Sequence, residues 1–213
     1  MSLEGLKLAA LYSYDCQKAK RLKINYLLAD FIKAEINQDQ VEKGLKELLS
    51  YAWYQIIASR SGIKDPFNEK VVRTYWTGSN LLKKIKGNRG EILLPFHNFT
   101  VLETAHNQEQ DLKDLDNCKI SIGRVDKIEG DNFDVSYYPL IKRNERIVLA
   151  DFHKPILINN KGFVWNVAVG EWITFHYRIV REVLEFEKAK EFYLRSREAV
   201  ELFNEAKQKD PHR

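Results

Sequence analysis

Cys118 and His176 are the two residues of this chain whose side chains could most readily share one chemical task. Cys118 begins the segment CKISIGRV, and His176 ends the segment GEWITFH. A thiolate and an imidazole together bind a soft or borderline metal such as iron well. The same two groups could also serve as a nucleophile and its general base. A lone cysteine is also often a small buried hydrophobe, so the pattern leaves a structural role open as well.

The segments around this pair have the period of β-strands. Apolar residues alternate in CKISIGRVDKI and NFDVSYY, and the turn residues Glu129–Asn132 between them predict a hairpin. Four more short strands are predicted in ERIVLADF, KPILIN, GFVWNV and EWITFHY. Six short strands separated by turns are typical of a small barrel or a sandwich, and closure of a barrel would bring its first and last strands together. We therefore expect Cys118 and His176 to meet at one rim.

The first half of the chain has a helical period instead. Apolar residues recur on one helix face over Val41–Ile57, and Gly62 is a suitable end for that helix. Asp65–Pro66 predicts the start of a second helix, with proline at its first position. This helix is expected to run through VVRTYWTGSNLLKKI and to end at Gly87 or Gly90. The N-terminal half is therefore predicted to be mainly helical.

The change of period divides the chain near the acidic run Asp111–Asp116, which is expected to be a solvated linker. The prediction is an α+β fold with a mainly helical domain over residues 1–110, whose helices end at about Lys86. Residues 111–213 are predicted to form a small β-barrel that starts at Asn117 and is followed by a C-terminal helix.

Composition excludes several classes of protein. The two cysteines, Cys16 and Cys118, are too few for a disulfide framework or for a zinc site built mainly from thiolates. No stretch approaches the roughly 20 apolar residues of a transmembrane helix, and the first residues lack signal-peptide features. We therefore expect a cytoplasmic protein with no membrane partner. The sequence has no G-x-G-x-x-G, Walker, H-E-x-x-H or G-x-S-x-G motif, and its formal charge of +4 is spread along the chain.

The order of segments in the C-terminal half resembles that of a known family. A C-x-x-x-x-G-x-V segment (Cys118, Gly123, Val125) is followed by a hairpin with the acidic turn Glu129–Asp131, by GEWITFH and by an acidic amphipathic helix. In this order the half-chain is similar to the HypC/HupF-type hydrogenase maturation chaperones. The resemblance implies an OB-like barrel that holds an iron fragment through Cys118 and His176. It also implies a chaperone rather than an enzyme, with a hydrogenase large subunit or a maturation factor as its protein partner.

The sequence departs from that family at three points. The family's cysteine lies at the extreme N-terminus, whereas Cys118 is internal and has no free amine beside it. Ile122 stands where the family has a proline, and the span Tyr138–Val169 is longer than the family needs. The resemblance therefore supports the prediction of a barrel and of the metal ligands more than it supports transfer of the metal.

The whole chain also resembles an uncharacterised family of accessory proteins that share the elements VVRTYWTG, HNF and LDNC. This resemblance names no chemistry, but it draws attention to His97 in the second element. His97 lies in EILLPFHNFTVLET, which is expected to be extended because Pro95 interrupts any helix there. We take His97 as a third candidate metal ligand beside Cys118 and His176, with a capping or core hydrogen bond as its alternative role. Trp76 of the first element is expected to lie in the helical core.

Two other functions fit the same segments. An OB-like barrel could stack nucleic-acid bases on Tyr137, Tyr138 and Trp165, but the basic residues are interleaved with acids, so nucleic acid is not the expected partner. A thiol enzyme could use Cys118 with either histidine, which requires a reactive thiol and an oxyanion site. The leading prediction is an accessory protein that handles iron, with a helical domain that docks a protein partner.

Overall fold

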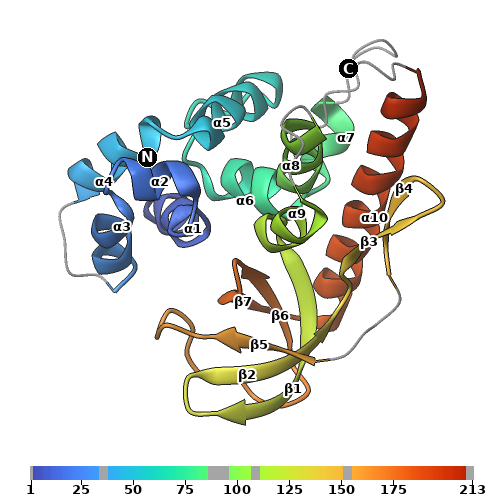
Figure 1. The fold of residues 1–213 in the computed structure, drawn as a ribbon. Helices are drawn as coiled ribbons and strands as arrows, with labels where there is room; N and C mark the ends of the chain where they lie inside the picture. The colour runs from blue at the N-terminus through green and yellow to red at the C-terminus, as the bar shows by residue number, and fades with distance from the viewer. Residues whose placement is uncertain (1, 34–37, 86–95, 107–110, 151–154, 210–213) are drawn as a thin grey trace. The chain divides into compact units, whose positions relative to one another are not determined.

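The computed structural model describes residues 2–33, 38–85, 96–106, 111–150 and 155–209. The chain divides into two compact units, Met1–Phe96 and His97–Arg213. Helices make up the first unit, and a closed barrel with helices makes up the second (Figure 1). The predicted α+β fold, with helices before a small barrel and a C-terminal helix, is confirmed. The predicted boundary at residue 110 falls within the second unit, after its first helix.

The helices of the first unit are α1 (Leu3–Ser13), α2 (Gln17–Arg21), α3 (Asn25–Ile32), α4 (Gln38–Lys46), α5 (Leu49–Arg60), α6 (Glu69–Thr77) and α7 (Leu81–Ile85). α1 packs against α3, α4 and α6. The ring of Trp76 on α6 is buried and stacks on the ring of Tyr12 on α1, with centroids 5.4 Å apart. The predicted core role of Trp76 is confirmed.

Three helix ends in this unit differ from the prediction. The apolar face of Val41–Ile57 belongs to two helices, because Leu48 is extended between them (φ −85°, ψ 149°). α6 begins after Asn68, whose side chain accepts the backbone N–H two residues ahead at 3.0 Å, whereas Asp65 makes the same contact within a turn before the helix. Gly78 (φ 76°) then ends α6, so one predicted helix is two.

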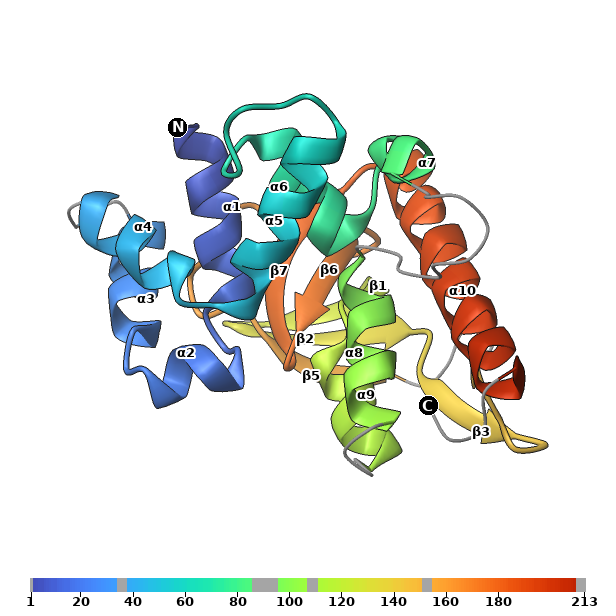
Figure 2. The same cartoon turned by 90° about the horizontal axis from the view of Figure 1, so that it is seen from above.

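The second unit consists of α8 (His97–His106), α9 (Leu112–Cys118), β1 (Ser121–Glu129), β2 (Asn132–Tyr137), β3 (Leu140–Arg143), β4 (Arg146–Leu149), β5 (Pro155–Asn159), β6 (Trp172–His176), β7 (Ile179–Leu184) and α10 (Phe186–Lys209). Its barrel has the closed order β1-β2-β5-β7-β6 (Figure 2). Neighbouring strands are antiparallel except β5 and β7, which are parallel. Counted along the chain, the barrel strands follow the order 1-2-3-5-4, which is an OB-like arrangement.

The interior of the barrel is apolar. Its buried core consists of Val125, Phe133, Val135, Ile158, Ile173, Phe175 and Val180. Gly123 lies where β1 passes close to β2, because a Cβ atom there would meet the Val135 side chain at 2.4 Å. Side chains of one strand alternate between two faces, so Thr174 and His176 of β6 lie on the face opposite to Ile173 and Phe175.

The observed barrel has five strands rather than the predicted six. Residues 162–167 (GFVWNV) form no strand, and β3 and β4 pair only with each other in a separate two-stranded sheet. β7 is absent from the prediction. It follows β6 after a turn at Tyr177 and Arg178, both with positive φ (49° and 60°). Because such turns normally carry glycine, asparagine or aspartate, this sequence contains no signal for the hairpin.

Two segments near the site are helical where the prediction has extended chain. α8 starts at His97, after Pro95 in the sequence, and residues 91–95 of the predicted extended segment lie outside the described residues. Cys118 is the last residue of α9, and the first strand of the barrel begins at Ser121 rather than at Asn117. In the described parts of the chain, no helix is both long and apolar enough to span a bilayer.

Candidate metal site

The second unit brings His97, Cys118 and His176 together. One potential ligand atom of each residue lies within 4.8 Å of the ligand atoms of the other two. The three residues stand at element ends: His97 begins α8, Cys118 ends α9 and His176 ends β6. The proximity expected from the sequence is therefore present, and it includes the third candidate, His97.

The pairing of β1 with β6 explains the approach of Cys118 to His176. The two strands are antiparallel, and Ser121 at the start of β1 is opposite Phe175 near the end of β6. The two chain segments also stay together beyond the strand ends, because the Tyr177 N–H donates to the Asn117 carbonyl oxygen at 3.0 Å. The end of α9 and the end of β6 consequently meet at one rim of the barrel.

Asn98 explains the place of His97. Its side chain is buried and makes two hydrogen bonds to one residue: Nδ2 donates to the Ile120 carbonyl oxygen at 2.9 Å, and Oδ1 accepts the Ile120 N–H at 2.7 Å. Nδ2 also donates to the Ser196 hydroxyl of α10 at 3.1 Å. The amide thus joins the start of α8 to the chain between α9 and β1. Asn98 was not among the predicted site residues, although it belongs to the HNF element, because its role depends on backbone groups 22 residues away.

The imidazole of His97 has the hydrogen bond and the protonation state that are typical of a metal ligand. Its Nε2 lies 3.0 Å from the Cys118 carbonyl oxygen, which can only accept, so Nε2 carries the proton and Nδ1 carries the lone pair. Metal-binding histidines commonly donate their other ring N–H to a carbonyl in this way. Burial lowers the pKa of His97 to about 4, against a smaller opposing effect of this hydrogen bond. The ring is therefore neutral at pH 7, the state that binds metals.

His176 is the most deeply buried of the three, at 1% exposure. Its ring centroid lies 5.4 Å from that of His97, and the two rings are nearly perpendicular (79°). The backbone carbonyl of His176 accepts a hydrogen bond from Nη2 of the buried Arg181 at 3.3 Å. Cys118 is half-buried, so it is the most exposed residue of the cluster.

Asp116 and Lys119 form a buried ion pair beside the cluster. Lys119 Nζ lies 3.0 Å from Asp116 Oδ1, and burial lowers the pKa of Lys119 against the opposing effect of this carboxylate. Asp116 also accepts hydrogen bonds from the Tyr137 hydroxyl and the Leu140 N–H, each at 2.7 Å. The expected solvated linker is thus wrong for Asp116, whose side chain is 14% exposed. Asp111 also has a structural role, as the N-cap of α9.

The separation of the three ligand atoms is close to what a metal needs. Bonds of about 2.0–2.3 Å in tetrahedral geometry place neighbouring ligand atoms roughly 3.3–3.8 Å apart. The observed limit of 4.8 Å therefore requires a contraction on the order of 1 Å, which side-chain rotation can supply. Two imidazoles and one thiolate suit zinc, copper or iron, and leave at least one coordination position open.

The aromatic residues of the nucleic-acid alternative are not arranged as a stacking platform. Tyr137 packs edge-on against Phe175 with ring centroids 5.5 Å apart, and Tyr138 lies against Tyr193 of α10 at 4.4 Å. Of the three proposed stacking residues, Trp165 is widely exposed (79%). The two tyrosines therefore serve packing within the second unit.

Comparisons with known proteins add a family and no chemistry. No curated protein and no solved structure matches the chain. A family model matches residues 34–94 and 92–210, and its description is a family of unknown function, DUF6390. This match agrees with the whole-chain resemblance to an uncharacterised family and gives no support to the hydrogenase-chaperone resemblance of the C-terminal half. The chain belongs to the DUF6390 family.

Proposed function

We propose that this protein is a metal-binding accessory protein that holds an iron ion or iron fragment through His97, Cys118 and His176 and presents it to a protein partner. The observation that carries the proposal is the convergence of three ligand atoms within 4.8 Å from three different elements. The neutral His97 ring and its hydrogen bond to the Cys118 carbonyl support it further.

The number of ligands favours a carrier over a structural metal site. Structural metal sites usually have four protein ligands, whereas catalytic sites leave one coordination position open for water or substrate. Among the described residues, three side chains converge, and Cys118 is half-buried whereas the two histidines are buried. An exogenous ligand or a partner's side chain would complete the coordination.

The position of Cys118 favours metal binding over thiol catalysis. Reactive cysteines gain thiolate character at helix N-termini or beside cations. Cys118 lies at the C-terminal end of α9, where the partial negative charge of the helix disfavours an isolated thiolate and favours a cation. A metal ion supplies the positive charge that a thiolate at this position needs.

The choice of iron as the metal and the choice of partner rest on the resemblance to the hydrogenase maturation chaperones. The ligand set alone would accept zinc as well, so iron is the narrower part of the proposal. The partner in this reading is a hydrogenase large subunit or another maturation factor, and the helical first unit is the part that would dock it.

Anaerobic titration of the full-length protein with Fe²⁺ and, separately, Zn²⁺ tests the proposal. We expect one Fe²⁺ per chain and an ultraviolet thiolate-to-metal absorption band. Cys118→Ser should weaken binding by about 100-fold or more, because even the loss of an outer-shell partner costs 10–100-fold. Cys16→Ser is the matched control, since Cys16 is also half-buried but lies outside the cluster.

The outcomes separate the parts of the proposal. Equal metal binding by the wild type and Cys118→Ser would reject the site. Tight Zn²⁺ binding with no Fe²⁺ binding would keep the site and reject iron. Failure of the loaded protein to transfer iron to hydrogenase maturation partners, while the metal stays bound, would reject the partner.

A further inference from the structure

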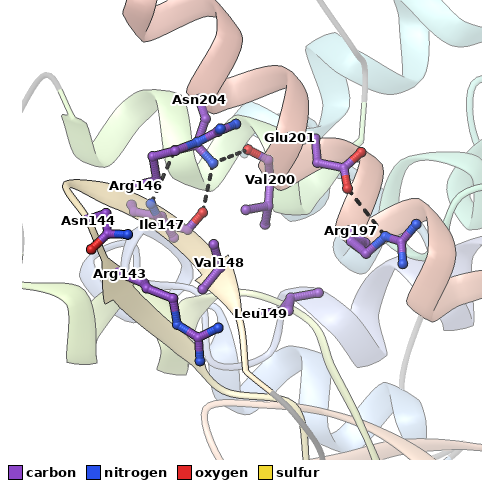
Figure 3. Close-up of a pocket in the computed structure, with 10 residues that line it drawn as sticks. All are labelled: Arg143, Asn144, Arg146, Ile147, Val148, Leu149, Arg197, Val200, Glu201 and Asn204. Atoms are coloured by element: carbon purple, nitrogen blue, oxygen red, sulfur yellow. Dashed lines mark hydrogen bonds and ion pairs between the residues drawn. The ribbon is translucent and has the colours of Figure 1, made fainter.

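The groove between the β3–β4 hairpin and α10 has the mixed composition of an ordinary solvated surface (Figure 3). Its volume is about 360 Å³, and apolar side chains line it together with charged ones of both signs. Arg197 is paired with Glu201 at 3.3 Å, and Asn204 of α10 makes hydrogen bonds to Ile147 of the hairpin. One helix of the first unit, α5, has an exposed face of a different kind.

The helix α5 turns apolar side chains to solvent as well as to the core. Its buried residues are Ser50, Tyr54, Ile57 and Ala58. Among all its residues only Arg60 is charged. A surface helix normally has charged and polar residues on its solvent side, and the preceding helix α4 follows this rule with its exposed Lys43 and Lys46. The exposed face of α5 therefore lacks the composition that water alone would favour.

The exposed apolar residues of α5 form one stripe, namely Leu49, Ala52, Trp53 and Ile56. They follow the i, i+3, i+4, i+7 spacing of a single helix face. Leu49 is 58% exposed, Ile56 is 38% exposed, Ala52 is exposed and Trp53 is partly exposed. α6 packs against the other side of α5 (Figure 2). This spacing is the one by which an amphipathic helix packs its apolar face against a protein partner.

The stripe is complementary to a second copy of itself. In a two-fold symmetric pair, residue i contacts residue j of the other copy and residue j contacts residue i. A two-fold axis midway between Ala52 and Trp53 is also midway between Leu49 and Ile56. Two antiparallel α5 helices would therefore place Ala52 opposite Trp53 of the partner subunit, and Leu49 opposite Ile56 of the partner subunit. The small alanine leaves room for the indole, the side chain that most often anchors protein interfaces.

The charges at the two ends of α5 favour the same antiparallel arrangement. Arg60 is the last residue of the helix, one turn beyond Ile56, and the exposed Glu47 lies two residues before the helix starts. Within the described residues neither of these two charges forms an ion pair. An antiparallel pair would bring Arg60 near Glu47 of the partner subunit at both ends. A parallel pair would instead bring like charges together, so charge complementarity selects the antiparallel one.

We propose that α5 is a self-association surface through which two copies of this chain form an antiparallel dimer. One helical stripe buries less than the roughly 1,200–2,000 Å² of a stable interface, so we expect a weak dimer with a dissociation constant on the order of 10–100 µM. The surface belongs to the first unit and contains no residue of the metal cluster, so Cys118→Ser should dimerise like the wild type.

Sedimentation equilibrium of the full-length protein, with EDTA and a reducing agent, measures the association from about 1 to 500 µM. We expect the average mass to rise with concentration from that of one 25.0 kDa chain towards twice that value. Leu49→Glu should weaken the dimer by at least about 10-fold, because the pair would bury two carboxylates. Leu49 is the first residue of α5, where an acid stabilises a helix, so the variant should fold. Leu3→Glu is the matched control, since Leu3 is the first residue of α1 and is 40% exposed.

Charge reversal tests the antiparallel register. Glu47→Arg should weaken the dimer by about 5-fold, because it replaces two attractive contacts with repulsive ones, and Glu47→Arg/Arg60→Glu should restore it. Failure of the double variant to restore association would overturn the antiparallel arrangement, and equal weakening by Leu3→Glu and Leu49→Glu would overturn the surface. A wild type that stays monomeric over the whole range would overturn the dimer. If Leu49→Glu, and not Leu3→Glu, then lowered the melting temperature, the stripe would be covered within the chain itself.

Discussion

The two units differ in the kind of polar side chain that they bury. Among the described residues of the first unit, the buried polar side chains are hydroxyls and one acid, namely Ser13, Asp15, Ser50, Thr74 and Thr77. The described residues of the second unit include four buried basic side chains, namely His97, Lys119, His176 and Arg181. Burial of an ionisable group costs free energy unless the group is paired or neutral. Side chains kept in place at such a cost are where function is most often found, which is why we place the proposed function in the second unit.

The first unit, by contrast, uses its polar groups to complete an aromatic core. Trp76 Nε1 donates to the Tyr54 hydroxyl while its ring stacks on Tyr12. Burial raises the pKa of Tyr54 far above its usual value, so this hydroxyl stays protonated and acts only as a hydrogen-bonding group. The buried polar groups of the first unit therefore serve the stability of its core.

The largest expected effect is in the first unit. Trp76→Ala should lower the free energy of unfolding by about 3–5 kcal/mol, the usual range for an aromatic core truncation, and it also removes one hydrogen bond to the Tyr54 hydroxyl. Urea unfolding of the metal-free protein measures it. The comparison predicts that the folded variant still binds one metal ion; a loss of metal binding in the folded variant would break the division of roles.

The next effect is a pH dependence that belongs to His97. Its pKa is about 4 in the folded protein and 6.5 in the unfolded chain, so only the unfolded chain binds this proton between these values. The contribution of His97 to the free energy of unfolding should therefore be complete above pH 6.5. It should fall by about 3 kcal/mol on acidification to pH 4, at about 1.4 kcal/mol per pH unit. His97→Gln should lack this part of the slope. Urea unfolding of both metal-free proteins from pH 7 to pH 4 isolates it from other titrating groups, and identical slopes would contradict the assignment.

A smaller effect is expected at Asn98, which positions the site without being a ligand. Asn98→Ala leaves the buried N–H and carbonyl of Ile120 without their side-chain partner, which should cost about 2–3 kcal/mol of stability. Because the start of α8 is then less firmly held, metal affinity should also fall by about 10-fold. Thr104→Ala is the control on the same helix, since Thr104 is exposed and bonds only within α8. Unchanged metal affinity in the folded Asn98→Ala variant would show that the residue serves stability alone.

The smallest effect distinguishes the two cysteines. Cys16→Ser in the first unit should change stability by less than about 0.5 kcal/mol, because Cys16 is only half-buried and its side chain makes no cap hydrogen bond to α2. Thermal unfolding with and without metal measures this. A change in the metal-induced shift of the melting temperature would mean that Cys16 takes part in binding.

Part of this architecture could be predicted because it depends on local periodicity. The alternation around Val125 and Val135 specifies barrel strands, and the meeting of Cys118 with His176 follows from closure of the barrel. What could not be predicted depends on backbone conformations that the residue types do not reveal. The turn at Tyr177 and Arg178 has positive φ without the residue types that indicate such a turn, so β7 could not be predicted from the sequence.

Two residues of the site region were misjudged for a different reason. Asp116 has the local sequence of an exposed linker, yet its carboxylate accepts hydrogen bonds across the fold, from the Tyr137 hydroxyl and the Leu140 N–H. Asn98 likewise acts on a backbone segment that is distant in sequence. Long-range polar contacts of this kind are set by tertiary structure, which hydrophobic patterns do not encode.

The pairing of β1 with β6 also determines when the metal site can exist during biosynthesis. Cys118 and His97 leave the ribosome well before His176, and β6 is the strand that closes the barrel onto β1. A nascent chain therefore lacks one of the three ligands until nearly the whole barrel has been synthesised. Under the proposed function, translation order itself would delay metal capture until the barrel is complete.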